Sequence, residues 1–126
     1  MTQPVNNRIN WFEIPVNDLA RASTFYSEIL ETALESGPTM DGFQMVMFPP
    51  TEGVNGALVQ GETYVPSGQG AVIYLSGGDD LTTVLSRVEG AGGKALSEKI
   101  DIGDGNGFCA YFEDTEGNRI GLHSMG

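Results

Sequence analysis

The sequence of 126 residues predicts an α+β fold built from two similar βαβββ modules. Three observations predict this fold. The same order of strand and helix signals occurs twice, with a period of about 60 residues. A strand that leads through Asp-Leu into a helical pattern occurs in each half, at 15–19 and at 76–81. The long apolar strand runs of a doubly wound parallel sheet are absent from the sequence.

The first module covers about residues 7–62 and begins with a strand. Residues 9–15 are rich in β-branched and aromatic side chains and end at a proline. Asp18 is a suitable N-cap, and apolar residues then recur at helical spacing, which predicts a helix from Asp18 to about Glu31. Three further strands are predicted at 32–36, 43–48 and 56–61.

The second module covers about residues 70–126, after a linker at 62–69 that contains proline and glycine. A strand at 70–76 leads through a Gly-Gly-Asp-Asp turn into a helical pattern. That pattern ends at Gly92-Gly93, as helices commonly end at glycine. The remaining strands are predicted at 94–97, 108–113 and 118–123.

Two glycine-rich segments separate the last strands. Residues 101–107 are predicted to form a loop. Gly117 and Asn118 are predicted to supply the positive-φ residues that the closing hairpin needs. The whole chain is therefore expected to form a single domain of two modules.

The charge of the chain limits the classes of function. Seventeen acidic and six basic residues give a formal net charge of −11. Six scattered basic residues do not form the patch that nucleic acid or an anionic membrane surface requires, so we expect neither partner. The acidic balance also disfavours anionic ligands, unless an arginine lies where it can receive them. The four arginines are Arg8, Arg21, Arg87 and Arg119.

The cysteine content and the absence of targeting signals predict a cytoplasmic protein. Cys109 is the only cysteine, and a lone thiol survives best in a reducing compartment. The segment 1–8 lacks the apolar stretch of a secretory signal. No apolar run approaches the roughly 18 residues that a membrane span needs.

Three stretches resemble one known family. The first is the opening strand and helix at 12–30, which contains the pairs Asp-Leu and Phe-Tyr. The second is the helix at 80–93, which ends in Ala-Gly-Gly. The third is the closing hairpin at 110–122, which contains Phe-Glu-Asp-Thr-Glu-Gly-Asn. They are similar to the glyoxalase/bleomycin-resistance/extradiol-dioxygenase family, also called the vicinal oxygen chelate superfamily. The resemblance implies a curved mixed sheet whose two half-barrels enclose a cleft for a small ligand. It also implies a homodimer.

The resemblance further implies a divalent metal, which family enzymes hold with His, Glu or Gln at strand positions. The matching positions here are Trp11, Val72 (or Ile73 with a slip of one residue) and Gly121, and near 57–60 only Gln60 could coordinate. Trp, Val and Gly do not ligate metals. We therefore predict no metal site and no cofactor, with a divalent metal as the open alternative.

Strand parity points to other candidates in the cleft. Trp11 and Glu13 share a face, as do Gly121 and His123. Glu13 and His123 could form a catalytic acid–base pair for proton transfer beside a carbonyl. The alternative is that Glu13 is solvated at a strand edge and that His123 lies in a frayed terminus.

Four residues are candidates for ligand binding. Trp11 could stack on a flat ligand, and Tyr74 could reach it with its hydroxyl. Gly121 would leave room for the ligand, and Gln60 would lie near it. The alternative for Trp11 is core filling, and for Tyr74 a half-buried strand position.

These observations favour a metal-free protein that binds small molecules, as bleomycin-resistance proteins do. An acidic cleft would attract cationic compounds. The first alternative is a lyase or isomerase of the glyoxalase type that acts on a small carbonyl or a thiol conjugate. The second is a structural or regulatory subunit with a vestigial cleft.

Overall fold

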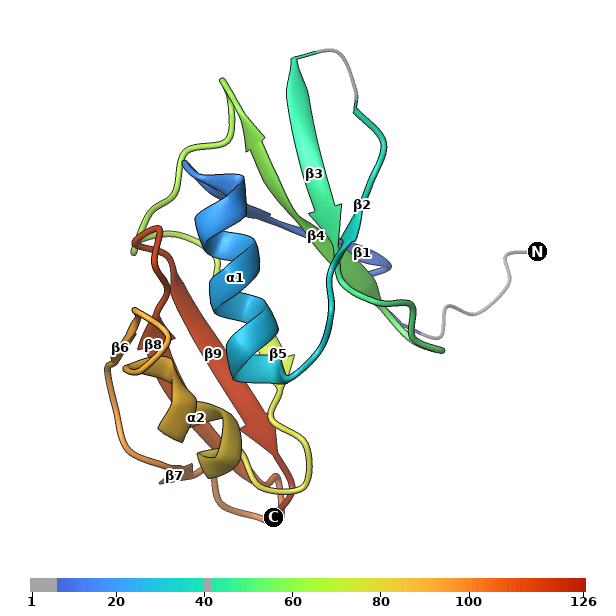
Figure 1. The fold of residues 1–126 in the computed structure, drawn as a ribbon. Helices are drawn as coiled ribbons and strands as arrows, with labels where there is room; N and C mark the ends of the chain where they lie inside the picture. Colours follow the sequence, from blue (N-terminus) through green and yellow to red (C-terminus); the bar gives the residue numbers. More distant parts are fainter. Residues whose placement is uncertain (1–6, 40–41) are drawn as a thin grey trace, which may run out of the picture.

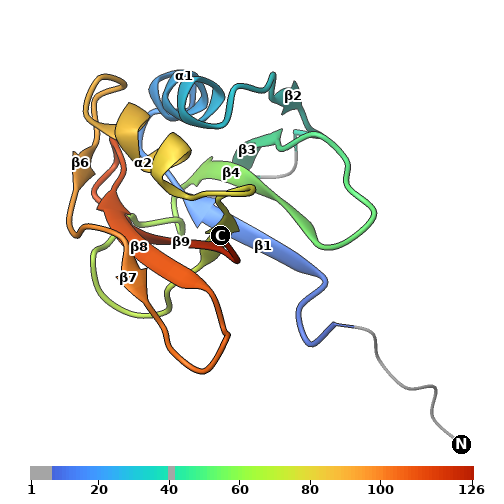
Figure 2. The ribbon, with the colours of Figure 1, turned by 90° about the horizontal axis from the view of Figure 1, so that it is seen from below.

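Two mixed β-sheets lie side by side, and both helices cover the same side of them (Figure 1, Figure 2). This arrangement comes from a computed structural model that describes residues 7–39 and 42–126. Over those residues the sheets do not close into a barrel. The predicted α+β fold with mixed strand orientation is confirmed.

The first sheet has the strand order β1-β4-β3-β2. β1 runs parallel to β4, and the other neighbours are antiparallel. Its elements are β1 (Trp11–Pro15), α1 (Leu19–Leu30), β2 (Glu35–Ser36), β3 (Phe43–Met47) and β4 (Asn55–Gly61). All four strands and the helix match predicted elements, and Asp18 caps α1 by accepting from the backbone N–H of Arg21 at 3.0 Å.

The second sheet has the order β5-β9-β8-β6, and β7 also pairs with β8. β5 and β9 are parallel, whereas β8 and β9 form the closing antiparallel hairpin. Its elements are β5 (Tyr74–Ser76), α2 (Thr82–Val88), β6 (Lys94–Ala95), β7 (Ile100–Asp101), β8 (Phe108–Glu113) and β9 (Arg119–Ser124). Within the described residues, neither helix is long and apolar enough to cross a membrane.

The structure departs from the sequence prediction mainly in the second module, where α2 ends at Val88, before the predicted Gly92-Gly93. The strand predicted at 70–76 is shortened to β5, whose three residues pair with Gly121, Leu122 and His123 of β9. Asp101 belongs to β7 and not to the predicted loop, and its carboxylate accepts from the N–H of Gly103 at 2.8 Å. At the hairpin only Gly117 has a positive φ, of 90°, and Asn118 contributes through its side chain instead.

The core joins both halves of the chain. Phe25 and Tyr26 of α1 are fully buried, and their rings lie 5.9 and 6.4 Å from the ring of Phe112 in β8. α1 and α2 contact each other over the sheets. The large aromatic side chains of α1 therefore pack the first module onto the second.

A buried polar cluster in the closing hairpin ties the two halves together. Asp114 accepts from the hydroxyl of Tyr26 at 2.7 Å. The side-chain amide of Asn118 donates to the carbonyl of Pro15 at 2.7 Å, and its oxygen accepts from the N–H of Ser67 at 3.0 Å. Glu116 completes the cluster. Each polar group has partners, as burial requires, so this motif has a structural role.

Glu116 holds the N-terminus of α1. One carboxylate oxygen accepts from the backbone N–H groups of Asn17 and Asp18, at 2.8 and 2.9 Å, and Arg21 pairs with both oxygens. Burial alone would raise the pKa of Glu116. The bonds from Arg21, Asp18, Thr115 and Asn17 outweigh burial and hold this pKa at about 2.

Candidate functional site

The candidate site is the side of the two sheets that faces away from α1 and α2, which we call the open face. Ile14 and Leu122 point into the core and are fully buried. Because strand side chains alternate, Trp11 and Glu13 project onto the open face, as do Gly121 and His123. Trp11 is 40% exposed there, so it is not the plain core residue of the alternative reading.

Glu13 of the first sheet is hydrogen-bonded to two aromatic residues, Trp11 of the same strand and Tyr64 of the segment after β4. Its carboxylate accepts from the hydroxyl of Tyr64 at 2.8 Å and from the indole N–H of Trp11 at 3.3 Å. The hydrogen bond to Glu13 raises the pKa of Tyr64, with a smaller contribution from burial. Glu13 is thus partly buried and hydrogen-bonded, and it fixes the indole of Trp11 in place.

Tyr74 and Tyr111 form a second aromatic pair on the adjacent sheet. Their hydroxyls are hydrogen-bonded to each other, and their rings lie 5.7 Å apart at 68°. The hydrogen bond from Tyr74, followed by burial and the thiol of Cys109, raises the pKa of Tyr111 to about 12. Tyr111 therefore stays protonated at neutral pH and can act as a donor.

The ring of Tyr74 covers Gly121. The two residues are register partners, and a Cβ on Gly121 would lie 2.5 Å from Cδ2 of Tyr74. Glycine is thus needed here for the close approach of the ring. The sequence predicts that Gly121 leaves room for a ligand, but the tyrosine ring takes that space.

Arg119 lies at the start of β9 and stacks on Tyr111. Its guanidinium carbon is 4.2 Å from the centroid of that ring, a favourable cation–π arrangement. Arg119 also lines a cavity of about 190 Å³ between β1 and β9, together with Glu13, Ser67 and Gln69. This cavity lies between Glu13 of the first sheet and Arg119 of the second.

His123 and Glu13 have separate hydrogen-bond partners. Nε2 of His123 lies 2.8 Å from the carbonyl oxygen of Asn106. Because a carbonyl only accepts, Nε2 carries the proton in this bond. Glu13 bonds to Trp11 and Tyr64 instead. The structure records no bond between His123 and Glu13 in the described residues, so the acid–base pair stays a prediction.

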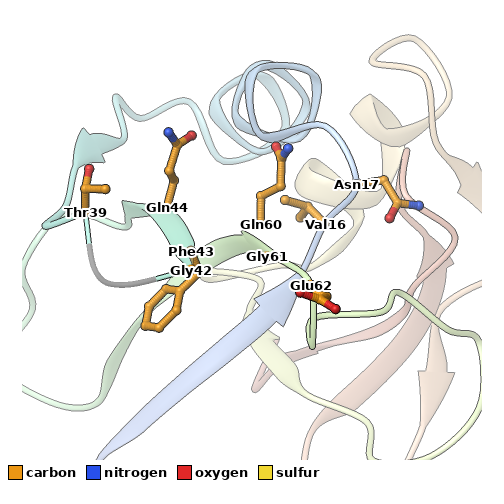
Figure 3. Close-up of a pocket in the computed structure, with 9 residues that line it drawn as sticks. All are labelled: Val16, Asn17, Thr39, Gly42, Phe43, Gln44, Gln60, Gly61 and Glu62. Atoms are coloured by element: carbon orange, nitrogen blue, oxygen red, sulfur yellow. The ribbon is translucent and has the colours of Figure 1, made fainter.

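Gln60 does not lie on the open face. It points toward α1, and its oxygen accepts from the backbone N–H of Leu19 at 2.8 Å (Figure 3). It borders a hollow of about 620 Å³ in which Gln44 points the same way and Phe43 points to the opposite side of the sheet (Figure 3). Gln60 follows Val59 in β4, and neighbouring side chains of a strand point to opposite faces of the sheet. Val59 is buried on the face opposite to α1, so Gln60 points toward α1 and away from Trp11 and Tyr74.

The residues on the open face include few metal-binding side chains. Over residues 7–39 and 42–126, no three His, Cys, Asp or Glu side chains come together as metal ligands would. Of the matching positions, Trp11 donates its N–H to Glu13, and Gly121 is covered by Tyr74. This donor set does not fit a divalent metal, which needs several O, N or S ligands.

Sequence reasoning did not place three residues on this face: Tyr64, Tyr111 and Arg119, the last of which was named only among four arginines that could receive an anion. Counting across the hairpin turn would have found Tyr111, because it pairs with Gly121 and so shares its face. The same parity places Arg119 with Gly121. Tyr64 lies in the segment predicted as a linker, and no periodicity signals its contact with Glu13.

The fold and the open face together define a small α+β protein of two modules whose sheets present an aromatic surface. A sequence model of the "Glyoxalase/Bleomycin resistance protein/Dioxygenase superfamily" matches residues 8–122. The chain belongs to this family. It is also similar to a "Glyoxylase-like domain-containing protein" from Didymella fabae, with 31% identity over 122 residues that cover 90% of this chain and 91% of the relative.

Solved structures share the fold at low sequence identity. A family enzyme from Burkholderia phytofirmans PsJN superposes with a TM-score of 0.67 at 14% identity, covering 92% of this chain and 97% of that one. A glyoxalase/bleomycin resistance protein from Albidiferax ferrireducens T118 gives 0.65 at 17% identity, covering 92% and 98%. A fosfomycin resistance protein from Listeria monocytogenes gives 0.64 at 17% identity, covering 96% and 92%.

Proposed function

We propose that this protein binds a small aromatic molecule on its open face without the divalent metal of the family. The ligand would lie against Trp11 and Tyr74, which are the large aromatic side chains most exposed there, at 40% and 50%. An exposed indole offers a flat surface for stacking, and the Glu13 carboxylate already fixes its orientation. A fixed aromatic platform loses little entropy when a ligand binds.

The observation that carries this proposal is the packing of Tyr74 on Gly121. In the family pattern, the position of Gly121 is where the closing strand supplies a carboxylate to the metal. Here a Cβ at this position would lie 2.5 Å from the Tyr74 ring, so a side chain there would require the ring to move. The ring over Gly121 supports aromatic binding in place of metal chemistry.

The proposal has a direct test. Protein purified without a metal-affinity tag is analysed for bound elements and then screened by thermal shift against single-ring and double-ring aromatic compounds. We expect less than a tenth of an equivalent of divalent metal, and a melting temperature that rises with ligand concentration, as linkage requires. A stoichiometric divalent metal whose removal abolishes binding would refute the proposal. It would favour the alternative, a glyoxalase-like lyase or isomerase.

Two coarser expectations accompany this proposal. The exposed apolar side chains along the sheets, such as Leu96 and Ile100, support a homodimer in which a second copy covers part of this surface. The buried free thiol of Cys109 supports a cytoplasmic location.

A further inference from the structure

We infer that the ligand carries a carboxylate group, which Arg119 and the Tyr74–Tyr111 hydroxyl pair receive at the seam between the two sheets. This inference rests on the proposed function and narrows the class of ligand. It is opposite to what the net charge of the chain suggests, because an acidic protein attracts cations at long range. The local donors decide between these two readings.

Arg119 is placed to receive an anion. Three other basic side chains are engaged in ion pairs: Arg21 with Glu116, Arg87 with Glu31, and Lys99 with Asp80. Arg119 forms no ion pair within the part of the chain that the structure describes. Its guanidinium carbon instead lies 4.2 Å from the centroid of the Tyr111 ring, and the N–H donors of the guanidinium can bind a carboxylate.

The absence of an ion pair at Arg119 is informative, because the acidic residue Glu113 lies opposite it on the neighbouring strand. Glu113 of β8 is the register partner of Arg119, and the two residues share a face. The side chain of Arg119 nonetheless turns along the sheet toward Tyr111. A stacked arginine loses less side-chain entropy on binding than a freely rotating one, so the guanidinium is partly ordered for its ligand.

The tyrosine pair adds a donor of the same kind. Two hydroxyls carry two protons, and the bond between Tyr74 and Tyr111 uses one of them. The other proton is available to a ligand. The arginine and the hydroxyl pair therefore present donors, which suit a carboxylate and would repel an ammonium group.

The adjoining cavity sets the size of the group. Arg119 lines a cavity of about 190 Å³, with Ile73 and Pro15 as apolar walls and Ser67 and Gln69 as polar ones. Neither Trp11 nor Tyr74 lines this cavity, so it suits the small polar end of the ligand and not its aromatic ring. Glu13 also lines this cavity. Its negative charge repels a carboxylate, which would therefore be directed to the Arg119 side.

The test uses three probes with the same ring and different charge: benzoate, benzamide and benzylammonium. Their binding to the full chain is followed by ¹H–¹⁵N NMR titration at low ionic strength. We expect benzoate to bind at least tenfold more tightly than benzamide, the gain of a charge-assisted hydrogen bond, and benzylammonium to bind most weakly. Arg119→Gln should remove the preference for benzoate and leave benzamide binding within about threefold of the wild type.

A matched control separates local recognition from net charge. Lys94→Gln removes one positive charge from an exposed residue of the same sheet, and it should keep the benzoate preference. If Arg119→Gln does not fold, Arg119→Lys keeps the charge without the flat fork and should weaken the preference by several-fold. The wild-type ranking tests the inference without any variant.

The outcomes of these titrations separate the carboxylate inference from the proposed binding of aromatic molecules. Equal binding of all three probes, or tighter binding of benzylammonium, would overturn the carboxylate inference and leave aromatic binding intact. A loss of preference in Lys94→Gln as large as in Arg119→Gln would overturn it as well. Failure of all three probes to bind would count against both the inference and the proposed function for single-ring ligands.

Discussion

Replacement of Glu116 by glutamine should weaken the connection between the two halves of the fold. Residue Glu116 is only 8% exposed. Its carboxylate accepts five hydrogen bonds, of which two come from the guanidinium of Arg21. Glutamine retains one carbonyl oxygen for the N–H groups of Asn17 and Asp18. Its amide nitrogen, however, would face the guanidinium, so one donor would meet another.

The magnitude follows from the pKa of Glu116. The ordinary value is 4.5 and the folded value is about 2, and each unit is worth about 1.4 kcal/mol. The difference corresponds to roughly 3–4 kcal/mol, which solvent around the half-exposed Arg21 reduces to about 2 kcal/mol. Because the folded pKa is lowered, this stability is present above pH 4.5 and is lost as the pH falls toward 2.

Urea denaturation of the wild type and of Glu116→Gln, between pH 3 and pH 7, measures this effect. We expect the variant to be less stable by about 2 kcal/mol at pH 7, with less than roughly half of that difference remaining at pH 3. Glu28→Gln, on the exposed side of α1, is the control and should change stability by less than about 0.5 kcal/mol. Equal effects of the two variants at pH 7, or a difference that does not depend on pH, would refute the electrostatic account.

Three further predictions concern the open face and the assembly. Gly121→Ala should destabilise the protein by about 1–3 kcal/mol through overpacking against the Tyr74 ring. Adding Tyr74→Ala to the same chain should reverse most of this loss. If the two changes are instead additive in a double-mutant cycle, the contact between them is contradicted. If Glu13 and His123 act as an acid–base pair, Glu13→Gln and His123→Ala should each abolish any turnover of a carbonyl substrate while ligand binding persists, and unchanged turnover in either variant would end that hypothesis. Sedimentation equilibrium should give twice the monomer mass of 13.4 kDa, and a monomer at high micromolar concentration would exclude a stable homodimer.

The parts of the fold that sequence reasoning predicted are those that depend on local signals. The N-cap at Asp18, the helical spacing of α1 and the turn at Gly117 follow from short-range rules, and the structure confirms them. Alternation along β1 also placed Trp11 and Glu13 on one face. The open face could therefore be outlined from the sequence.

The contacts between distant segments could not be predicted in the same way. Tyr64 comes from a segment without periodicity, and its bond to Glu13 spans 51 positions. The Tyr74 ring fills the space over Gly121 because β5 and β9 are parallel neighbours, a pairing that no local signal specifies. Gln60 supports α1 and not the candidate site, because its side chain lies on the opposite side of β4 from that of Val59.

The hydrogen bonds between the closing hairpin and the start of α1 have a consequence for how the chain folds. Asn118 and Pro15 are 103 positions apart, and Glu116 and Asn17 are 99 apart. Contacts of such long range are slow to form, because a large loop must close before they stabilise anything. We therefore expect the first half to stay incompletely folded during synthesis until the hairpin of β8 and β9, which carries the partners of Asn17 and Tyr26, has been made.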